Sequence, residues 1–499
     1  MPPVQNRRMT LPCPRHALPA LMLAATLALL AAPAAHATLP APVRAALQRA
    51  ELPEDALGVV VLPLNARRPA VAHRAEVAMQ PASTIKLVTT AVALDRLGAN
   101  HRGRTELLSA APLQGEVLAG DLVLRGGVDP ELGLPQLWAL LAELRWQGIR
   151  EIAGDVLLDR SAWRPARTDQ GLPPFDEEPE FPYNVIPDAL QLAGNLAWLE
   201  LQADGEKVQA RVLPPMERVE LVNRLTLRDA PCASWDVKPL WRTPVSTRLG
   251  QGADSVVRIE LTGSFPKHCS QRPLLQLMDR DDLADRLLRL AWTQLGGTWR
   301  GQARPGVAPP DARLLTQRES RPWGEVIRVV NKRSDNPLTR MLFLSLGQPG
   351  MAADPGATTA ELATRVVHNW FVEHDIPTEG LVLDNGSGLS RAERITPMQM
   401  ARVIQTALNG PYAPELLMSM PMAGVDGFMR QRFGTSAANQ RARLKTGGLR
   451  NVAALAGMVL DADDQPVVMV AIVNHDQPRK GRAAIDALVE WIAQSRMPR

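Results

Sequence analysis

The pattern of secondary structure changes in the middle of this chain and then changes back, which strongly constrains the fold. An amphipathic helical stretch follows residue 82 and helical patterns return from about residue 315, whereas short β-type runs separated by turns fill most of residues 105–314. The 499 residues also exceed what one hydrophobic core usually holds, about 100–200 residues. The chain is therefore expected to form a helix-rich domain interrupted by a β-rich insertion.

Several elements can be placed from periodicity and turn signals. A buried strand is expected at 58–62, a helix from Ser83 that ends at Gly98, and a strand hairpin at 453–460 and 466–473. Further helices are expected at 134–147, 323–330, 357–374, 394–408 and 481–494. Residues 163–187 are rich in Pro, Asp and Glu and are expected to form a loop.

The first 37 residues have the pattern of a secretory signal peptide. Arg7, Arg8 and Arg15 precede an apolar run at 18–32, and Ala35-His36-Ala37 is a small-x-small cleavage site. A membrane anchor is the alternative, but the run is shorter than the ~20 residues that span a bilayer. We expect cleavage after Ala37, a periplasmic protein, and no integral membrane anchor in the mature chain.

Charge argues against nucleic acid as a partner. Removing the expected signal peptide takes away three arginines and no acidic residue, so the formal charge falls from +4 to +1 (4 − 3). A nearly neutral body without a Lys/Arg run lacks the basic surface that nucleic-acid binding requires.

Two cysteines remain after signal removal, Cys232 and Cys269. An even pair in an exported chain favours a disulfide, with two buried thiols as the alternative. The pair has no Cys-x-x-Cys spacing and no adjacent His-x-x-His, so no metal site is expected.

The first chemical motif is Ser83-Thr84-Ile85-Lys86. On a helix, residues i and i+3 share a face, so Lys86 can reach the Ser83 hydroxyl and, with a lowered pKa, take its proton. The spacing alone is weak evidence, because Ser264-Phe265-Pro266-Lys267 repeats it without an amphipathic helix behind it.

Two later motifs have other chemical capacities. In Ser334-Asp335-Asn336, the serine can relay a proton and the Asn336 side chain can hold a substrate amide, although a helix cap or turn explains these residue types equally well. In Lys445-Thr446-Gly447-Gly448, a cation and a hydroxyl can hold a carboxylate, and the glycines permit close approach of a ligand backbone. A simple turn is the alternative there.

The three motifs together, in this order, resemble the Ser-x-x-Lys, Ser-Asp-Asn and Lys-Thr-Gly set of penicillin-binding proteins and class A β-lactamases. Ser83 and Ser334 are 251 residues apart (334 − 83), much farther than in compact β-lactamases. Such an insertion resembles the class C low-molecular-mass penicillin-binding proteins, the D-alanyl-D-alanine carboxypeptidase/endopeptidase family. Supporting stretches lie at 126–130, 154–159, 331–336 and 384–391.

The resemblance implies an α/β (α+β) fold with a transpeptidase/β-lactamase-like catalytic domain, an antiparallel sheet flanked by helices, and nested β-rich insertions. The expected division is a signal peptide at 1–37, a catalytic domain at 38–104 and 315–499, an inserted domain II at 105–129 and 219–314, and an inserted domain III at 130–218.

The resemblance also assigns roles to site residues. Ser83 would attack the carbonyl of D-Ala-D-Ala, Lys86 would take its proton, and Ser334 with Lys445 would pass a proton to the departing D-alanine. Backbone N–H groups of Ser83 and Gly448 would form the oxyanion hole. The remaining positions expected to bind substrate are Asn336 for the penultimate amide, Thr446 for the terminal carboxylate, and Gly447 beside it.

Two further assignments rest on the same resemblance. Asp176 would meet the side-chain amine of a peptidoglycan stem peptide, and Arg391 its carboxylate. A solvated acidic loop is the alternative for Asp176, and bracing of the 386–388 loop is the alternative for Arg391. Gly448 departs from relatives, which often carry Ser or Thr there, so a side-chain contact is lost while the backbone N–H remains.

The expected function is a serine-type D-Ala-D-Ala carboxypeptidase, D,D-endopeptidase, or both, acting on peptidoglycan stem peptides without a cofactor. β-Lactams should acylate Ser83. The alternatives are a β-lactamase, against which the long insertion argues, and a non-catalytic peptidoglycan-binding scaffold, against which the three intact motifs argue.

Overall fold

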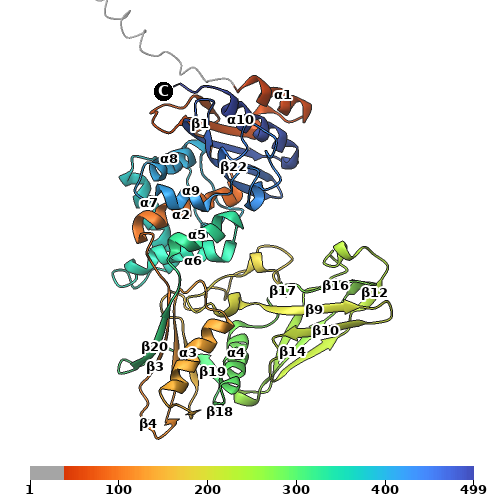
Figure 1. Cartoon of the computed structure of the whole chain (residues 1–499), viewed down its shortest axis with the longest axis vertical. Coiled ribbons are helices and arrows are strands. Elements are labelled where there is room, and N and C mark those ends of the chain that lie inside the picture. Colours follow the sequence, from red (N-terminus) through yellow and green to blue (C-terminus); the bar gives the residue numbers. More distant parts are fainter. Residues whose placement is uncertain (1–38, 499) are drawn as a thin grey trace, which may run out of the picture.

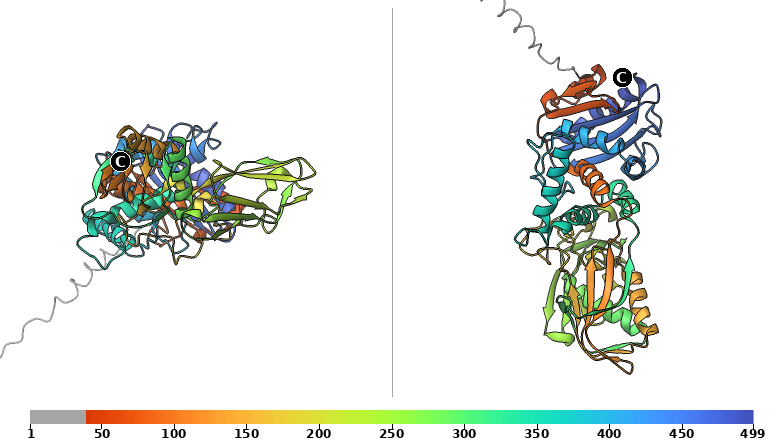
Figure 2. Two further views of the ribbon diagram at one scale, coloured as in Figure 1. Left: turned by 90° about the horizontal axis from the view of Figure 1, so that it is seen from below. Right: turned by 90° about the vertical axis from the view of Figure 1, so that its left-hand side faces the viewer.

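The computed structural model describes residues 39–498. They form an upper part built from both ends of the chain and a lower part built from its middle (Figures 1 and 2). The chain leaves the upper part near residue 104 and returns to it after residue 319, where strands β3 (Arg104–Ser109) and β20 (Arg313–Glu319) pair antiparallel. The expected signal peptide lies outside the described residues.

The upper part is organised around a five-stranded antiparallel sheet in the order β2-β1-β23-β22-β21. Its central strands are almost wholly buried on both faces, which explains their continuous apolar sequence. β21 is an edge strand. The strands are β1 (Leu57–Pro63), β2 (Val71–His73), β21 (Ala442–Leu449), β22 (Val452–Leu460) and β23 (Pro466–Asn474).

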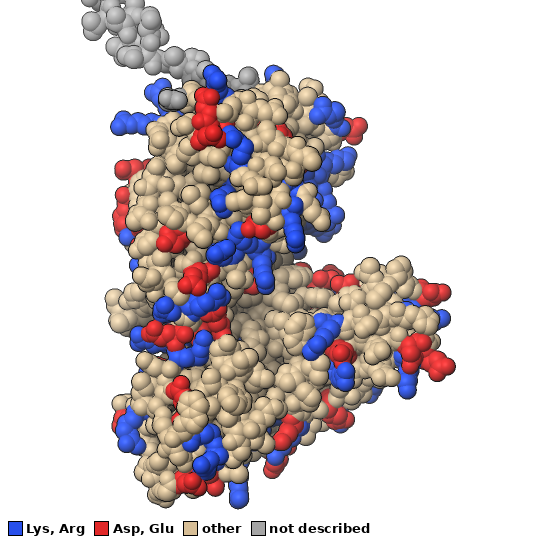
Figure 3. Space-filling model, in the orientation of Figure 1, with Lys and Arg blue, Asp and Glu red and all other residues tan. Residues whose placement is uncertain are grey.

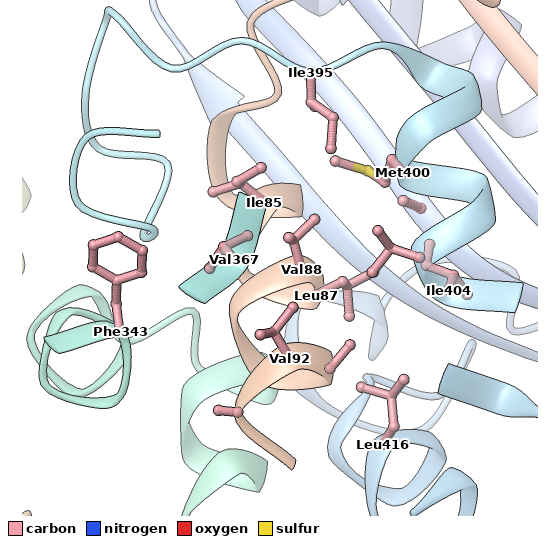
Figure 4. Packing of buried hydrophobic residues seen from close by; sticks show 14 of the residues in the cluster. Ile85, Leu87, Val88, Val92, Phe343, Val367, Ile395, Met400, Ile404 and Leu416 are labelled. Carbon is pink, nitrogen blue, oxygen red and sulfur yellow. The ribbon is translucent and has the colours of Figure 1, made fainter. Parts of the chain in front are cut away.

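Helices cover both faces of this sheet. α1 and α10 pack together on one face, while α8 and the helices around α2 cover the other. α2 follows a 3₁₀ turn at Ala82–Ile85 and is buried from Lys86 to Leu94, with Val88 and Val92 packed among neighbouring helices (Figure 4). The helices are α1 (Ala41–Arg49), α2 (Lys86–Leu97), α5 (Trp323–Lys332), α6 (Asn336–Gly347), α7 (Thr359–Glu373), α8 (Pro397–Leu408), α9 (Ala413–Ser419) and α10 (Arg482–Gln494).

The lower part contains a mixed sheet in the order β19-β8-β6-β3-β20, a small sheet in the order β18-β7-β5-β4, and two helices that contact each other. The helices are α3 (Leu134–Trp146) and α4 (Arg280–Gln294). The remaining strands are β4 (Leu113–Gln114), β5 (Val117–Leu118), β6 (Leu122–Gly127), β7 (Glu151–Ile152), β8 (Val156–Asp159), β18 (Thr298–Trp299) and β19 (Ala303–Pro305).

Residues 197–275 form a β-rich arm that projects to one side of the lower part (Figure 1). Its sheets pair β9 with β10, β16 and β17, β14 with β11 and β13, and β12 with β15. The strands are β9 (Ala197–Ala203), β10 (Val208–Leu213), β11 (Val219–Asn223), β12 (Thr226–Arg228), β13 (Val245–Leu249), β14 (Val256–Leu261), β15 (Ser264–Pro266), β16 (Ser270–Gln271) and β17 (Leu274–Leu275).

The expected elements agree with the structure to within a few residues. The hairpin is β22–β23, and the helix that begins near Ser83 ends at Gly98, which has a φ of 81°. β8 pairs with β6 and β19, so one sheet contains residues from both the expected inserted domain III and the expected inserted domain II. Pairing between strands far apart in sequence determines this grouping, and local patterns carry little information about it.

Candidate active site

Ser83 lies in the 3₁₀ turn that leads into α2, and Lys86 is the first residue of that helix. Lys86 Nζ is 3.1 Å from Ser83 Oγ and 2.7 Å from Asn336 Oδ1, and it also contacts the carbonyl oxygen of Ser387. Lys86 is fully buried, and burial lowers its pKa from 10.5 to about 7. The amine can therefore take a proton near neutral pH.

A second serine–lysine pair faces the first. Lys445, on the edge strand β21, places Nζ 2.9 Å from Ser334 Oγ and 2.7 Å from the carbonyl oxygen of Thr446. Burial, and then the charge of Lys86, lowers the pKa of Lys445 well below its usual value. Two buried amines close to two hydroxyls form a path along which a proton can move.

Asn336 joins this centre to the lower part of the molecule. It is the first residue of α6, whose N-cap Asp335 accepts a hydrogen bond from the Leu338 N–H at 2.8 Å. The Asn336 side-chain amide donates to the carbonyl oxygen of Tyr183 at 3.0 Å, while its oxygen contacts Lys86. Lys86, Asn336 and Tyr183 thus share one hydrogen-bond network, in which Tyr183 belongs to the loop at 163–187, called the inserted loop below.

The lysine-threonine-glycine motif borders the nucleophile. A Cβ at Gly447 would lie 2.7 Å from the carbonyl oxygen of Pro81, so the turn at Ser83 requires a glycine at this point of β21. Gly448 has open space around it. Thr446, Gly447 and Gly448 line a hollow of about 360 Å³ together with Ser83 and Ser334.

The inserted loop supplies another wall of the site. A hollow of about 860 Å³ is lined by Ser83, Ser334, Asn336, Asp176 and Arg391, among others. The Asp176 carboxylate accepts hydrogen bonds from the Tyr183 hydroxyl at 2.8 Å and the Asn184 amide at 2.7 Å. Asp176 is therefore held in place beside the hollow.

Arg391 also lines this hollow and contacts the inserted loop at 163–187. Its guanidinium is 5.2 Å from the centre of the Phe175 ring, so a cation–π contact joins the two parts of the molecule.

Glu393 is a buried residue near the centre that motif reasoning did not find. Its Oε1 accepts the N–H groups of Gly386 at 2.7 Å and Asn385 at 3.1 Å, which fixes the loop whose Ser387 carbonyl contacts Lys86. Tyr183 was missed as well. Neither residue belongs to a recognisable local pattern, so only the folded chain reveals them.

The other candidates lie away from this centre. Ser264 is in β15 of the arm, and its Oγ is buried without a hydrogen-bond partner among the described residues. Cys232 and Cys269 form a disulfide, also in the arm. Residues 39–498 contain no group of three or more His, Cys, Asp or Glu side chains arranged to hold a metal ion.

With this geometry established, comparison with known proteins gives the family. The model of the D-Ala-D-Ala carboxypeptidase 3 (S13) family matches residues 39–495. The chain belongs to the S13 family. It is accordingly a serine-type D-Ala-D-Ala carboxypeptidase, as the three motifs indicated.

Relatives and solved structures agree with this S13 assignment. A D-alanyl-D-alanine carboxypeptidase of Actinomadura sp. is 30% identical over 433 residues, covering 83% of this chain and 77% of the relative. The carboxypeptidase DacB of Haemophilus influenzae is 27% identical over 431 residues, covering 85% of this chain and 86% of the relative.

The crystal structure of penicillin binding protein 4 from Haemophilus influenzae has a TM-score of 0.74. The two chains are 24% identical, and the superposition covers 90% of this chain and 98% of the Haemophilus influenzae chain. The S13 chain thus has the penicillin-binding-protein fold that the sequence resembled, with a β-lactamase-like transpeptidase domain.

Proposed function

We propose that Ser83 is the nucleophile of this D-Ala-D-Ala carboxypeptidase and that Lys86 is its general base. The supporting observation is the 3.1 Å contact of the Lys86 amine with Ser83 Oγ, combined with a pKa near 7 for that amine. The free amine takes the hydroxyl proton as Oγ attacks the carbonyl carbon, and an acyl-enzyme forms.

The leaving D-alanine needs a proton as the peptide bond breaks. The Ser334 hydroxyl gives its proton to the departing nitrogen and regains one from Lys445, which lies 2.9 Å away. The proton that Lys86 took from Ser83 replaces the one that Lys445 gave, so both amines end the step uncharged. Backbone N–H groups of Ser83 and Gly448 stabilise the oxyanion, and Thr446 holds the terminal carboxylate. Water then attacks the ester, which frees Ser83 and releases the shortened peptide.

Peptidoglycan stem peptides are the proposed substrate. Asp176 is held at the wall of the Ser83 hollow, with Arg391 on the same hollow, so an amine and a carboxylate of a substrate side chain find opposite charges there. The same site suits D,D-endopeptidase cleavage of cross-linked peptides. The signal pattern supports cleavage after Ala37, a periplasmic location and no integral membrane anchor in the mature chain. Among residues 39–498, no helix is long and apolar enough to cross a bilayer.

β-Lactams are proposed as inhibitors that acylate Ser83. A Haemophilus influenzae penicillin binding protein 4 of the same fold has been crystallised in complex with a β-lactam, at 23% identity and a TM-score of 0.70. Nucleic acid is not a proposed partner, because the mature chain carries almost no net charge.

Labelling with fluorescent penicillin tests the nucleophile. Wild type and Ser264→Ala should each bind one equivalent, whereas Ser83→Ala should bind none. A label that maps to Ser264 would contradict the proposal, and rapid repeated turnover of nitrocefin would indicate a β-lactamase instead.

Mass analysis of digested cross-linked muropeptides tests the reaction. Release of D-alanine from pentapeptides indicates carboxypeptidase activity, and separation of dimers into monomers indicates endopeptidase activity. If dimers stay intact while D-alanine is released, the endopeptidase part of the proposal is wrong.

A further inference from the structure

A third hollow adjoins the 860 Å³ hollow that Ser83 lines, and four of its five charged lining residues are basic. It measures about 660 Å³ and shares Gly448, Leu449, Arg450 and Asp476 with the Ser83 hollow. We call it the basic hollow, because its lining includes Arg450, Arg479, Lys480 and Arg482. Asp476 is its sole acidic lining residue among the described part of the chain. Figure 3 shows Lys and Arg side chains gathered on the upper part, along the depression that separates it from the arm.

These cations are left largely without protein partners. All four side chains are exposed, and within residues 39–498 no ion pair joins Arg450, Arg479 or Arg482 to an acidic residue. Lys480 Nζ is 3.9 Å from a Glu51 carboxylate that is 86% exposed, and such a surface contact contributes little. Cations that line a concave surface focus a positive potential, which raises the local concentration of anions.

The segment that follows β23 carries three of the cations, at 479, 480 and 482, and hydrogen bonds fix it to the chain just before the 3₁₀ turn that contains Ser83. The Asn474 side chain accepts from the Gln80 N–H at 2.8 Å and donates to the Gln80 carbonyl at 3.0 Å, three residues before Ser83. The His475 N–H donates to the Asn451 carbonyl at 3.1 Å, which ties the same segment to the β21–β22 turn that Arg450 and Asn451 form. The basic hollow therefore keeps a constant position relative to Ser83.

The direction of the edge strand indicates which part of a substrate reaches this hollow. With the reacting carbonyl at Ser83 and the terminal carboxylate at Thr446, the acyl side of a peptide continues along β21 past Gly448 toward Arg450. We propose that the basic hollow is a subsite for carboxylates on the acyl side of an acidic peptide substrate. This inference rests on the proposed function, because it uses the proposed placement of the scissile peptide.

A peptide fits these observations better than a lipid surface does. The cations line a hollow that is continuous with the nucleophile's own hollow, whereas a membrane surface needs a flat or convex basic face. Binding by the same residues to anionic lipid is therefore an outcome that the experiment must distinguish.

Two synthetic peptides ending in D-Ala-D-Ala test the proposal. One carries glutamate at the second and third positions before the dipeptide, and the other carries glutamine there. For the wild-type protein we expect kcat/KM to favour the acidic peptide by about tenfold at low salt, and the preference to fade at about 0.5 M NaCl, where charges are screened beyond about 4 Å.

The matched variants have equal changes of net charge. Arg450→Gln/Arg479→Gln/Arg482→Gln should bring the ratio of the two kcat/KM values close to one. Arg224→Gln/Arg242→Gln/Arg300→Gln removes three exposed arginines of the lower part, and it should keep the wild-type ratio and salt dependence. Circular dichroism of both variants checks that each is folded.

Several results would overturn the proposal. An equal wild-type kcat/KM for both peptides at low salt contradicts it, as does an unchanged ratio in the first triple variant. If the first triple variant kept the wild-type ratio of the two kcat/KM values but lost binding to vesicles of anionic phospholipid, the basic hollow would be assigned to a lipid surface. If wild type hydrolyses neither peptide, the proposed function fails and this inference fails with it.

Discussion

At the scale of single residues, the proposed role of Lys86 as general base requires an uncharged amine inside a network that also contains charges. Burial is the largest cause that lowers its pKa, Glu393 and Asp335 raise it, and Arg340 lowers it, with a net value of about 7. The second amine, Lys445, is also fully buried. The balance among these groups sets the pH range in which Ser83 can react.

The first prediction concerns the pH dependence of acylation. Because the reaction needs the free amine, the acylation rate constant for fluorescent penicillin should rise about tenfold per pH unit below pH 7 and level off above it. Stopped-flow or quench measurements from pH 5 to 9 check this. A flat profile across this range would contradict the assignment of Lys86 as the base.

The second prediction concerns Glu393. Its carboxylate raises the Lys86 pKa, so Glu393→Gln should lower that pKa and move the rising limb of the acylation profile to lower pH. The amide oxygen can still accept the N–H groups of Asn385 and Gly386, so the loop should hold its position. An unmoved limb in a correctly folded variant would mean that Glu393 has a structural role alone.

At the scale of elements, the loop between α7 and α8 packs closely against the 3₁₀ turn at Ala82–Ile85, which contains Ser83. Gly388 has a φ of 83°, and a Cβ there would lie 2.1 Å from the Ala82 carbonyl oxygen and 2.6 Å from the Ser83 nitrogen. The contact is between backbones, so no side chain can move aside. Glycine at 388 is what permits Ser387 to reach Lys86.

The third prediction follows from this contact. Gly388→Ala should displace the loop, slow acylation of Ser83 by at least tenfold, and destabilise the protein by about 1–3 kcal/mol or more. Gly115→Ala is the control, because Gly115 also has a positive φ, 60°, but has open space around it. That control should cost about 1 kcal/mol and leave the acylation rate unchanged. Urea unfolding and penicillin kinetics measure both effects.

At the scale of the whole molecule, the inserted region forms part of the active site. The Tyr183 carbonyl oxygen accepts a hydrogen bond from the Asn336 side-chain amide, and the Phe175 ring stacks on Arg391. The loop at 163–187 therefore joins the upper and lower parts. The disulfide lies instead in the arm, and no residue of the arm lines the hollows that contain Ser83. The arm's stability and the chemistry at Ser83 are therefore expected to be separable.

The fourth prediction tests this separation. Cys232→Ser/Cys269→Ser removes a cross-link between residues 37 apart, which should reduce the stability of the arm by about 2–4 kcal/mol. Heating should then show an earlier unfolding transition, while stoichiometric labelling of Ser83 at 25 °C persists. Loss of labelling in this variant would show that the arm supports the catalytic centre.

Much of the site was predictable because its chemistry resides in short motifs. Ser83 and Lys86 share a helical face by spacing alone, and strand periodicity placed Lys445 before a hairpin. Ser264 has the same local spacing as Ser83, yet it lies in a strand without a lysine partner. The helix behind Ser83 distinguished the two, which is also local information.

Glu393, Tyr183 and the basic hollow were not predictable in this way. Glu393 follows a loop and has no motif, and Tyr183 contributes through its backbone carbonyl. Arg450 and Arg482 are far apart in sequence, and the charge of each is ordinary. Their importance comes from neighbours that only the folded chain supplies.

The sequence by itself determined the family, the nucleophile candidate, the main helices and strands, and the existence of a long insertion, because these depend on local spacing and periodicity. The tertiary structure decided which strands share a sheet, how far Lys86 lies from its partners, and where the inserted loop meets Asn336. These features depend on contacts between distant residues and on the burial they create. The low pKa of Lys86 is such a feature, since it requires the complete removal of water around the amine.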